Sequence, residues 1–184
     1  MTAAFEACIQ AVQRGGVIAY PTEAVYGLGC DPAQLAAVQR VLTLKQRPAH
    51  KGLILIAADF DQLAPYLLPL DSVTHARVMA TWPGAVTWIL PAQPHVSPLI
   101  RGEHDTLAVR VSAHPTCRAL CLRLGHPLIS TSANLSTLPP ARDAQAVAAQ
   151  FGTLLDGIVD APVGGQAQPT EIRQGLTGEI VRFS

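Results

Sequence analysis

The 184-residue sequence is 49% hydrophobic and only 14% charged, which excludes an intrinsically disordered chain. Lysine plus arginine equals aspartate plus glutamate, with 13 of each, so the whole chain lacks the basic signature of a non-specific nucleic-acid or membrane binder. The length suits one domain, and we predict a single domain over residues 1–184.

Three features that are absent from the sequence indicate where in the cell the protein is located. The N-terminal residues lack the cationic and apolar pattern of a secretion signal. No apolar run approaches the ~20 residues that a membrane-spanning helix needs. Four cysteines in a chain of this size do not look like a disulfide framework. We therefore expect a cytoplasmic protein.

The first part of the chain alternates helical and strand patterns. Residues 3–14 place apolar side chains on one helical face, and a glycine pair ends that helix. Residues 17–20 form a short apolar run bounded by glycine and proline, which indicates a buried strand. The Asp-Pro pair at 31–32 is a good N-cap and first position, so we expect a helix from there to Lys45.

The continuous apolar run at 53–57 predicts a central strand that is covered on both faces. The segment 91–105 is rich in proline and histidine and is predicted as a long loop, a kind of segment that is often functional. The other predicted elements are a short helix from Asp59 or Asp61 to Leu67, a helix at 72–81, strands at 85–90 and 106–111, a helix at 115–124, a strand at 127–130, a helix at 143–151 and a last strand at 179–183.

The order of these elements predicts the fold class. Helices and strands alternate, but the strands at 85–90 and 106–111 follow each other without a helix between them. A mixed sheet accommodates that order. We therefore predict an α/β fold with a mixed sheet flanked by helices.

Several common catalytic motifs are absent. Gly27-Leu28-Gly29 begins like a dinucleotide-binding fingerprint, but Pro32 stands where the third glycine would fall. The sequence has no G-x-x-x-x-G-K-[ST], no H-E-x-x-H and no G-x-S-x-G. The common NTPase, zinc-protease and hydrolase motifs are thus excluded.

Two histidines and two cysteines form a possible metal set: His114, Cys117, Cys121 and His126. Cys117 and Cys121 share a helix face, but one helix does not readily bring both histidines to the same point. Because cysteine is a common small core residue, we favour a structural role over a metal site.

The two lysines of the chain, Lys45 and Lys51, flank Arg47 within seven residues. Such a cluster is usually a solvated helix end whose cations complement the helix dipole. Alternatively, three cations at the exit of a buried helix can clamp a polyphosphate. The sequence leaves both interpretations open.

Polar side chains also follow the predicted strand at 127–130. The run Ser130–Ser136 is either a turn that satisfies its own backbone or a cradle of OH and NH donors for an anion or an amino acid. Arg110 occupies an inward strand position, where burial requires an anionic partner from the protein or from a substrate.

Taken together, these stretches resemble the YrdC/Sua5 family of threonylcarbamoyl-AMP synthases, and in length its short, single-domain bacterial form. The resemblance runs in order over nearly the whole chain. The matching segments are 20–29, 45–48, 82–84, 107–111, 130–136, 169–173 and 176–179.

The resemblance implies both an activity and a fold. The activity is nucleotidyl transfer, in which L-threonine, bicarbonate or CO₂, and ATP give L-threonylcarbamoyl-adenylate and pyrophosphate. The product would pass to the tRNA threonylcarbamoyl-transfer machinery for the t⁶A modification of tRNA. The implied fold is a twisted mixed sheet flanked by helices, with a concave ligand groove.

The resemblance also assigns residues to ligands. Lys45 and Arg47 would face the ATP phosphates and carry the catalytic role, and no side-chain nucleophile is needed because such transfer relies on positioning and charge neutralisation. The other implied nucleotide contacts are Thr106, Asn134, Arg142, Thr170 and Arg182. The implied threonine contacts are Thr22, Lys51, Arg110 and Ser132. Mg²⁺ would be held chiefly by the phosphates.

Three positions depart from the family pattern: Ala24 where a second threonine is frequent, Lys51-Gly52 in place of the His-Pro of the longer branch, and Thr137 in place of a glycine.

We expect Pro21-Thr22-Glu23 to form a wall of the amino-acid pocket. We expect Gly27 and Gly29 to turn the backbone from that wall into the next helix.

Two other functions compete with the enzyme. A cationic groove could hold an RNA backbone, although the balanced charge and the lack of interleaved aromatic and basic residues argue against this as the main role. A structural metal-binding protein built on His114, Cys117 and Cys121 would require bound metal.

Overall fold

The computed structural model describes residues 3–135, 138–168 and 170–182. Four residues of the predictions above lie outside these ranges: Ser136, Thr137, Pro169 and Phe183. The elements in chain order are α1 (Ala3–Gln13), β1 (Ile18–Pro21), β2 (Tyr26–Gly29), α2 (Leu35–Leu44), η1 (Ala49–Lys51), β3 (Ile54–Ala57), η2 (Ala64–Tyr66), α3 (Ser72–Met79), β4 (Val86–Pro91), α4 (Pro98–Arg101), β5 (Thr106–Val111), α5 (Pro115–Leu124), β6 (Leu128–Ser132), α6 (Ala144–Phe151), η3 (Gly152–Leu154), β7 (Gly157–Ile158), β8 (Glu171–Gln174) and β9 (Ile180–Arg182).

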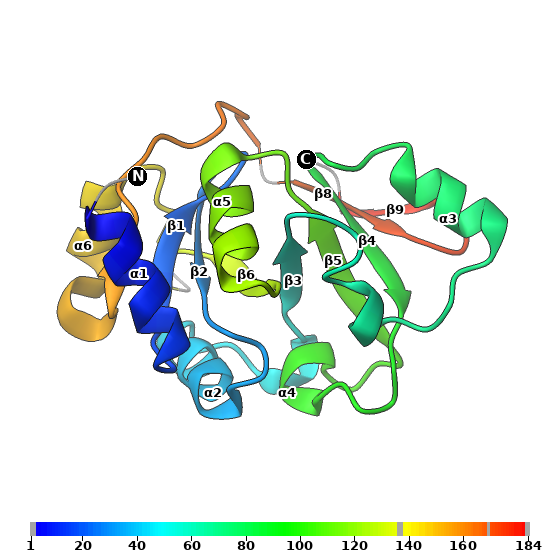
Figure 1. Cartoon of the computed structure of the whole chain (residues 1–184), viewed down its shortest axis with the longest axis horizontal. Coiled ribbons are helices and arrows are strands. Elements are labelled where there is room, and N and C mark those ends of the chain that lie inside the picture. The colour runs from blue at the N-terminus through cyan, green and yellow to red at the C-terminus, as the bar shows by residue number, and fades with distance from the viewer. Residues whose placement is uncertain (1–2, 136–137, 169, 183–184) are drawn as a thin grey trace.

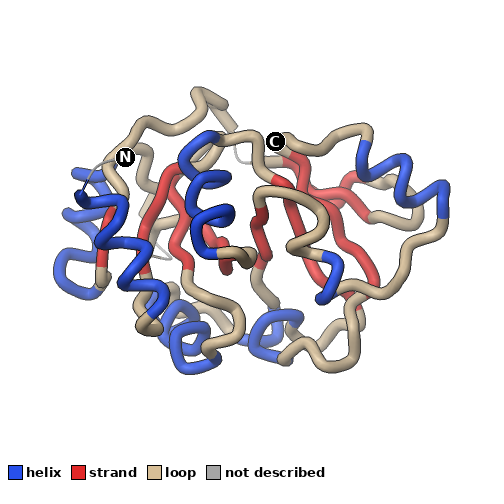
Figure 2. Tube along the Cα trace, in the orientation of Figure 1, coloured by secondary structure: helices blue, strands red, loops and turns tan. Residues whose placement is uncertain are grey.

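The strands of the described residues form one twisted sheet in the order β7-β1-β2-β6-β3-β5-β4-β8-β9 (Figure 1). The pairs β1/β7, β3/β5 and β4/β8 are parallel, and the other pairs are antiparallel. Helices α1 and α5 lie in front of the sheet, and α2 and α4 lie at its lower end (Figures 1 and 2). The predicted α/β fold with a mixed sheet flanked by helices is confirmed.

Strand β3 shows how the two faces of the sheet are covered. Leu55 packs in one apolar cluster with Val38 of α2. The next residue, Ile56, packs in a different cluster with α1 and with Leu120 of α5. Side chains alternate along a strand, so Ile54 points to the same face as Ile56, and it lines the cavity described below. One face of the sheet is therefore shared between the α1–α5 layer and a cavity.

Gly27 and Gly29 lie inside strand β2 and do not turn the chain toward a helix, so that expectation was wrong. A Cβ on Gly29 would stand 2.3 Å from the carbonyl oxygen of Ile129 and 2.7 Å from the ring of Tyr20. The reversal from β1 to β2 is made by residues 22–25. Gly29 is thus needed for close packing of β2 against its neighbours.

Helix α2 begins at Leu35, later than the predicted Asp-Pro start. The side-chain oxygen of Asp31 accepts a hydrogen bond from the backbone N–H of Ala33 at 2.8 Å, and its carbonyl accepts one from Gln34 at 3.1 Å. The Asp-Pro pair therefore forms a turn before the helix, and Gln34 occupies the N-cap position.

Other differences concern short elements. The predicted helix ending at Leu67 is reduced to the 3₁₀ turn η2, and the predicted loop at 91–105 contains α4, whose Ser97 N-cap and Pro98 first position are typical helix-start residues. Strand β8 was not predicted, because its residues are all half-buried and lack apolar alternation. Within the described residues, no helix has the length and apolarity needed to cross a membrane.

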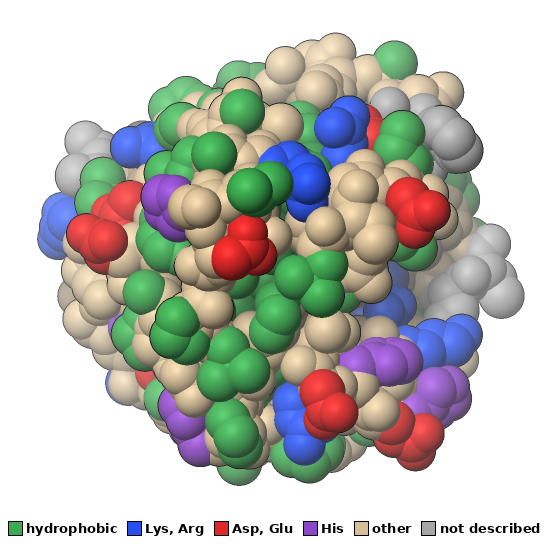
Figure 3. Space-filling model, turned by 90° about the vertical axis from the view of Figure 1, so that its right-hand side faces the viewer, with side chains coloured by type: hydrophobic (Ala, Val, Ile, Leu, Met, Phe, Trp, Pro, Cys, Tyr) green, Lys and Arg blue, Asp and Glu red, His purple; other side chains and the backbone are tan. Residues whose placement is uncertain are grey.

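The end of the molecule formed by α3, β8 and β9 leaves several large apolar side chains exposed, as Figure 3 shows for this face. Val73 of α3 is 64% exposed, and Leu176 between β8 and β9 is 58% exposed. Val78, on the buried side of α3, belongs to the same apolar cluster as Leu55 of β3.

Candidate functional site

A cavity of about 480 Å³ lies over strands β2, β6, β3 and β5. Its described lining holds five lysine and arginine side chains and no Asp or Glu: Lys51, Arg47, Arg101, Arg110 and Arg182. In a chain whose acidic and basic residues balance, this concentration of positive charge makes the cavity suitable for an anionic ligand.

The β1–β2 turn forms one wall of the cavity. Thr22 lines the cavity, and its hydroxyl donates to the carbonyl of Val25 at 2.7 Å. The backbone N–H of Thr22 donates to the same carbonyl at 3.1 Å. The threonine therefore closes its own turn, as β-hydroxyl residues do, and Ala24 beside it adds no hydroxyl to the lining.

Two loops meet at the mouth of the cavity through a pair of glycines. Gly52 and Gly102 have φ values of +64° and +71°, and a Cβ on Gly102 would stand 2.3 Å from the carbonyl oxygen of His50. This close backbone contact joins the loop after α2 to the loop after α4. It brings Lys51 and Arg101 to the same cavity.

Arg47 fixes the first of these loops from inside the cavity wall. Its Nε donates to the carbonyl of Gly52 at 2.9 Å, and its Nη2 donates to the carbonyl of Lys51 at 3.4 Å. Burial lowers the pKa of the Arg47 guanidinium. Because arginine keeps its charge under such a shift, Arg47 supplies both a loop anchor and a permanent cation.

Lys45 lies behind the lining and holds the segment after β6. Its Nζ donates to the carbonyl oxygen of Asn134 at 2.6 Å, to the side-chain oxygen of Asn134 at 2.7 Å and to Ser132 Oγ at 3.5 Å. Burial, and then the neighbouring charge of Arg47, lower the pKa of Lys45 to about 8. Lys45 thus connects the end of α2 to the hydroxyl-rich segment.

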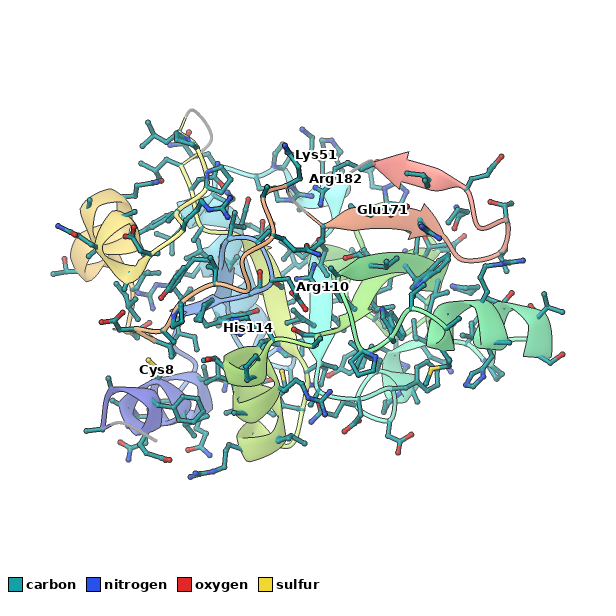
Figure 4. The ribbon with its side chains drawn as sticks, turned by 90° about the horizontal axis from the view of Figure 1, so that it is seen from above. Cys8, Lys51, Arg110, His114, Glu171 and Arg182 are labelled. Carbon is teal, nitrogen blue, oxygen red and sulfur yellow. The ribbon has the colours of Figure 1, made fainter. Side chains whose placement is uncertain are left out.

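Arg110 is buried on β5, with a side chain only 5% exposed. Its Nη1 donates to Thr170 Oγ1 at 2.5 Å, and its Nη2 lies 3.5 Å from Oε2 of Glu23. The expectation that an inward arginine needs an anionic partner is confirmed, and that partner is Glu23. In Figure 4 the Arg110, Lys51 and Arg182 side chains gather in the same region, seen from above.

The segment leading into β8 and β9 completes the lining. Arg182 Nη2 donates to the carbonyl of Thr170 at 2.8 Å. Burial lowers the pKa of Arg182, and the charges of Arg110 and Arg47 lower it further. Three guanidinium groups therefore share one electrostatic environment.

The structure brings most of the predicted site residues together. Those that line the cavity are Thr22, Arg47, Lys51, Thr106, Arg110, Ser132, Thr170 and Arg182. Lys45, Asn134 and Arg142 are not part of the lining. Lys45 and Asn134 bind each other beside Ser132, whereas the exposed Arg142 donates to the carbonyls of Gln166 at 2.7 Å and Ala167 at 3.1 Å.

Two titratable side chains of the described lining, Arg101 and His104, were not predicted. The signal available in the sequence was the length of the 91–105 loop, which marks a functional segment without saying which side chain returns to the site. Arg101 Nε donates to the carbonyl of Val96 at 3.1 Å, and its Nη1 donates to the carbonyl of His104. These bonds orient Arg101 within its own loop.

The candidate metal set is not assembled. Cys117 and Cys121 are fully buried in the apolar cluster beneath α5, and Cys121 Sγ donates to the carbonyl of Ile56 at 3.5 Å. His114 Nε2 lies 3.0 Å from the carbonyl of Pro162. In the described part of the chain, no three His, Cys, Asp or Glu side chains gather as metal ligands. The cysteines are core residues.

A family model named for Sua5, YciO and YrdC, with the description "Telomere recombination", matches residues 10–183. The chain belongs to this family. A threonylcarbamoyl-AMP synthase of Nitrosococcus oceani is 56% identical over 171 residues, which are 93% of this chain and 92% of the relative. One of Idiomarina loihiensis is 53% identical over 184 residues, or 99% and 98% of the two chains.

Solved structures of Sua5/YrdC proteins have the same fold. Sua5 of P. abyssi complexed with L-threonine is 30% identical, with a TM-score of 0.87 over 92% of this chain and 50% of that one. This chain therefore spans half the length of that Sua5. E. coli YciO is 28% identical, with a TM-score of 0.79 over 92% and 82% of the two chains.

Proposed function

We propose that this Sua5/YrdC protein is an L-threonylcarbamoyladenylate synthase, a nucleotidyltransferase that uses L-threonine, bicarbonate or CO₂, and ATP. The observation that carries the proposal is the cavity whose described lining holds five cations and no Asp or Glu, with the buried Arg110 among them. Curated relatives about half identical to this chain carry that name, and a Sua5 of the same fold binds L-threonine.

In the proposed reaction, Arg110 binds the threonine carboxylate and Ser132 lies beside the amino acid, while Thr22 forms the pocket wall. The threonine nitrogen bonds to the carbon of bicarbonate with loss of water, and a carbamate oxygen then attacks the α-phosphorus of ATP. The bond to pyrophosphate breaks in the same step. Arg47, Lys51 and Arg182 would stabilise the charge that accumulates on the leaving group.

We propose that the nucleotide binds in the same cavity as the threonine. Thr106 and Thr170 line it and offer hydroxyls to the nucleotide. Lys45 positions Asn134 at its edge, and Arg142 lies farther out, where it donates hydrogen bonds to the segment that leads to Thr170. The polar side chains of the described lining are hydroxyls, lysine, arginines and His104, with no Asp or Glu, and this set does not fit a protein-held Mg²⁺. We propose that Mg²⁺ enters bound to the ATP phosphates.

The test is pyrophosphate release. Purified protein incubated with ATP, Mg²⁺, bicarbonate and L-threonine should release pyrophosphate only when threonine is present, and labelled bicarbonate should enter an adenylate. Pyrophosphate release that does not depend on any amino acid would refute the proposal.

One prediction concerns Arg101, which we place beside the ATP phosphates in the cavity. Replacing Arg101 with Gln should raise KM for ATP about tenfold, because one cation is lost beside the polyphosphate, with little change in KM for threonine. Steady-state kinetics with each substrate varied would measure this. Arg123→Gln is the matched control, since Arg123 pairs with Glu6 away from the cavity. An equal rise in both KM values would place Arg101 outside the phosphate subsite.

We further propose that residues 1–184 act as one YrdC-like domain in the cytoplasm and pass the product to the tRNA threonylcarbamoyl-transfer machinery. One sheet from β7 to β9 supports the single domain. Direct RNA binding stays a prediction, supported only by the cationic lining. RNA affinity that falls steeply with salt and is competed by ATP would support it, and salt-independent binding would contradict it.

A further inference from the structure

Glu23 is a buried carboxylate in the turn between β1 and β2, with a side chain 9% exposed. Its Oε1 accepts hydrogen bonds from Ser112 Oγ at 2.7 Å and from the backbone N–H of Ala113 at 3.0 Å. Its Oε2 lies 3.5 Å from Nη2 of Arg110 and makes no hydrogen bond within the described residues. Because a lone buried charge is strongly destabilising, these two side chains depend on each other.

The backbone around Glu23 is also held in place. Its carbonyl accepts a hydrogen bond from Gln166 at 3.1 Å, and the carbonyl of the preceding Thr22 accepts one from Gly164 at 3.0 Å. A Cβ on Gly164 would stand only 3.0 Å from the Cα of Glu23, so the segment before β8 passes directly over this turn. The carboxylate therefore faces Arg110 from a fixed position.

Arg110 differs from the neighbouring cations of the cavity in having a carboxylate partner. Arg110 and Arg182 both bind Thr170, and Arg110 is close enough to lower the pKa of Arg182. Among the described residues, Arg47 and Arg182 have no carboxylate partner within salt-bridge distance. Glu23 therefore compensates the charge of Arg110, although it does not belong to the lining, and leaves the charges of Arg47 and Arg182 uncompensated.

We propose that Glu23 determines ligand specificity by reserving Arg110 for a carboxylate and keeping polyphosphate away from it. A single carboxylate can bind the oriented guanidinium by hydrogen bonds, whereas a triphosphate needs the uncompensated cations Arg47 and Arg182. Glu23 touches neither ligand and acts through Arg110, so it is a positioning residue. The inference rests on the proposed function, because its two ligands are threonine and ATP.

The test is the Glu23→Gln variant, with KM for threonine measured as ATP is raised well above its own KM. In the wild type, KM for threonine should stay nearly constant. In Glu23→Gln it should rise at least about fivefold, because ATP then competes for Arg110. Glu6→Gln is the matched control, since it removes an ion pair with Arg123 that lies away from the cavity. A Glu23→Gln variant with no more ATP dependence than the wild type would overturn the inference.

A second measurement separates this inference from the proposed function. If the wild type releases no threonine-dependent pyrophosphate, the proposed function fails, and calorimetric titration with inorganic tripolyphosphate decides the inference alone. Glu23→Gln should bind tripolyphosphate at least about fivefold more tightly than the wild type and Glu6→Gln, and equal affinities would overturn the inference.

If Glu23→Gln does not fold, Glu23→Asp, which retracts the carboxylate, should show both effects at about twofold, and no effect would count against the inference.

Discussion

Replacing Arg110 with Ala should lower kcat/KM for threonine by about 10²- to 10³-fold, the largest effect expected in this chain. The guanidinium is the proposed carboxylate ligand and is almost fully buried, so its loss removes a desolvated charge-assisted contact. The effect should appear mainly in KM for threonine, while KM for ATP changes much less. Pyrophosphate release with threonine varied at saturating ATP would measure it.

Removing Arg110 also leaves Glu23 without its partner, which by itself costs roughly 3–5 kcal/mol in a buried pair. The kinetics must therefore be accompanied by urea unfolding, and Arg123→Ala, which breaks the Glu6 ion pair on the outside of α1 and α5, serves as the surface control. Arg110→Lys keeps the charge but loses the planar donor fork, so it should retain intermediate activity. An unchanged threonine KM in folded Arg110→Ala would remove Arg110 from the threonine site.

The central part of the fold was predictable because a strand that is buried on both faces has a continuous run of apolar residues in the sequence. The runs at 53–57 and 106–111 are confirmed as β3 and β5, which pair with each other in the middle of the sheet. Strand β2 was not predictable in that way. Gly29 is required by contacts with Tyr20 and Ile129, and the Ile129 contact comes from a strand about a hundred residues away in the chain.

The site residues differ in the same way in how far the sequence could place them. Arg110 was identified as a buried cation in need of an anion because its position on a strand shows its burial directly. Arg101 was missed because its approach to the cavity depends on the contact between two loops at Gly52 and Gly102. The sequence places Lys45 beside the ATP phosphates, which stays a prediction, whereas its position behind the cavity lining, in contact with Ser132 and Asn134, depends on three-dimensional packing.

Lys45→Met should lower kcat/KM for ATP by about 10- to 100-fold, because the variant loses charge-assisted hydrogen bonds to the Asn134 segment and the positive charge that we propose to act on the phosphates from behind the lining. The same residue predicts a pH dependence. Burial and Arg47 lower the Lys45 pKa to about 8, so the ammonium is present below that pH and is lost as the pH rises through it. The wild-type kcat/KM for ATP should therefore decline above pH 8, well below the range of an ordinary lysine.

Binding of ATP should shift the pH of this decline, the alkaline limb of the pH profile, in a defined direction. Phosphates placed near Lys45 favour its charged form, so the decline in kcat, which reports the ATP-bound enzyme, should occur at a higher pH than the decline in kcat/KM. The Lys51→Met variant should keep the alkaline limb of kcat/KM, whereas Lys45→Met should lose it. If Lys45→Met kept the limb, the group that titrates would be elsewhere, and the link between Lys45 and the nucleotide would be refuted.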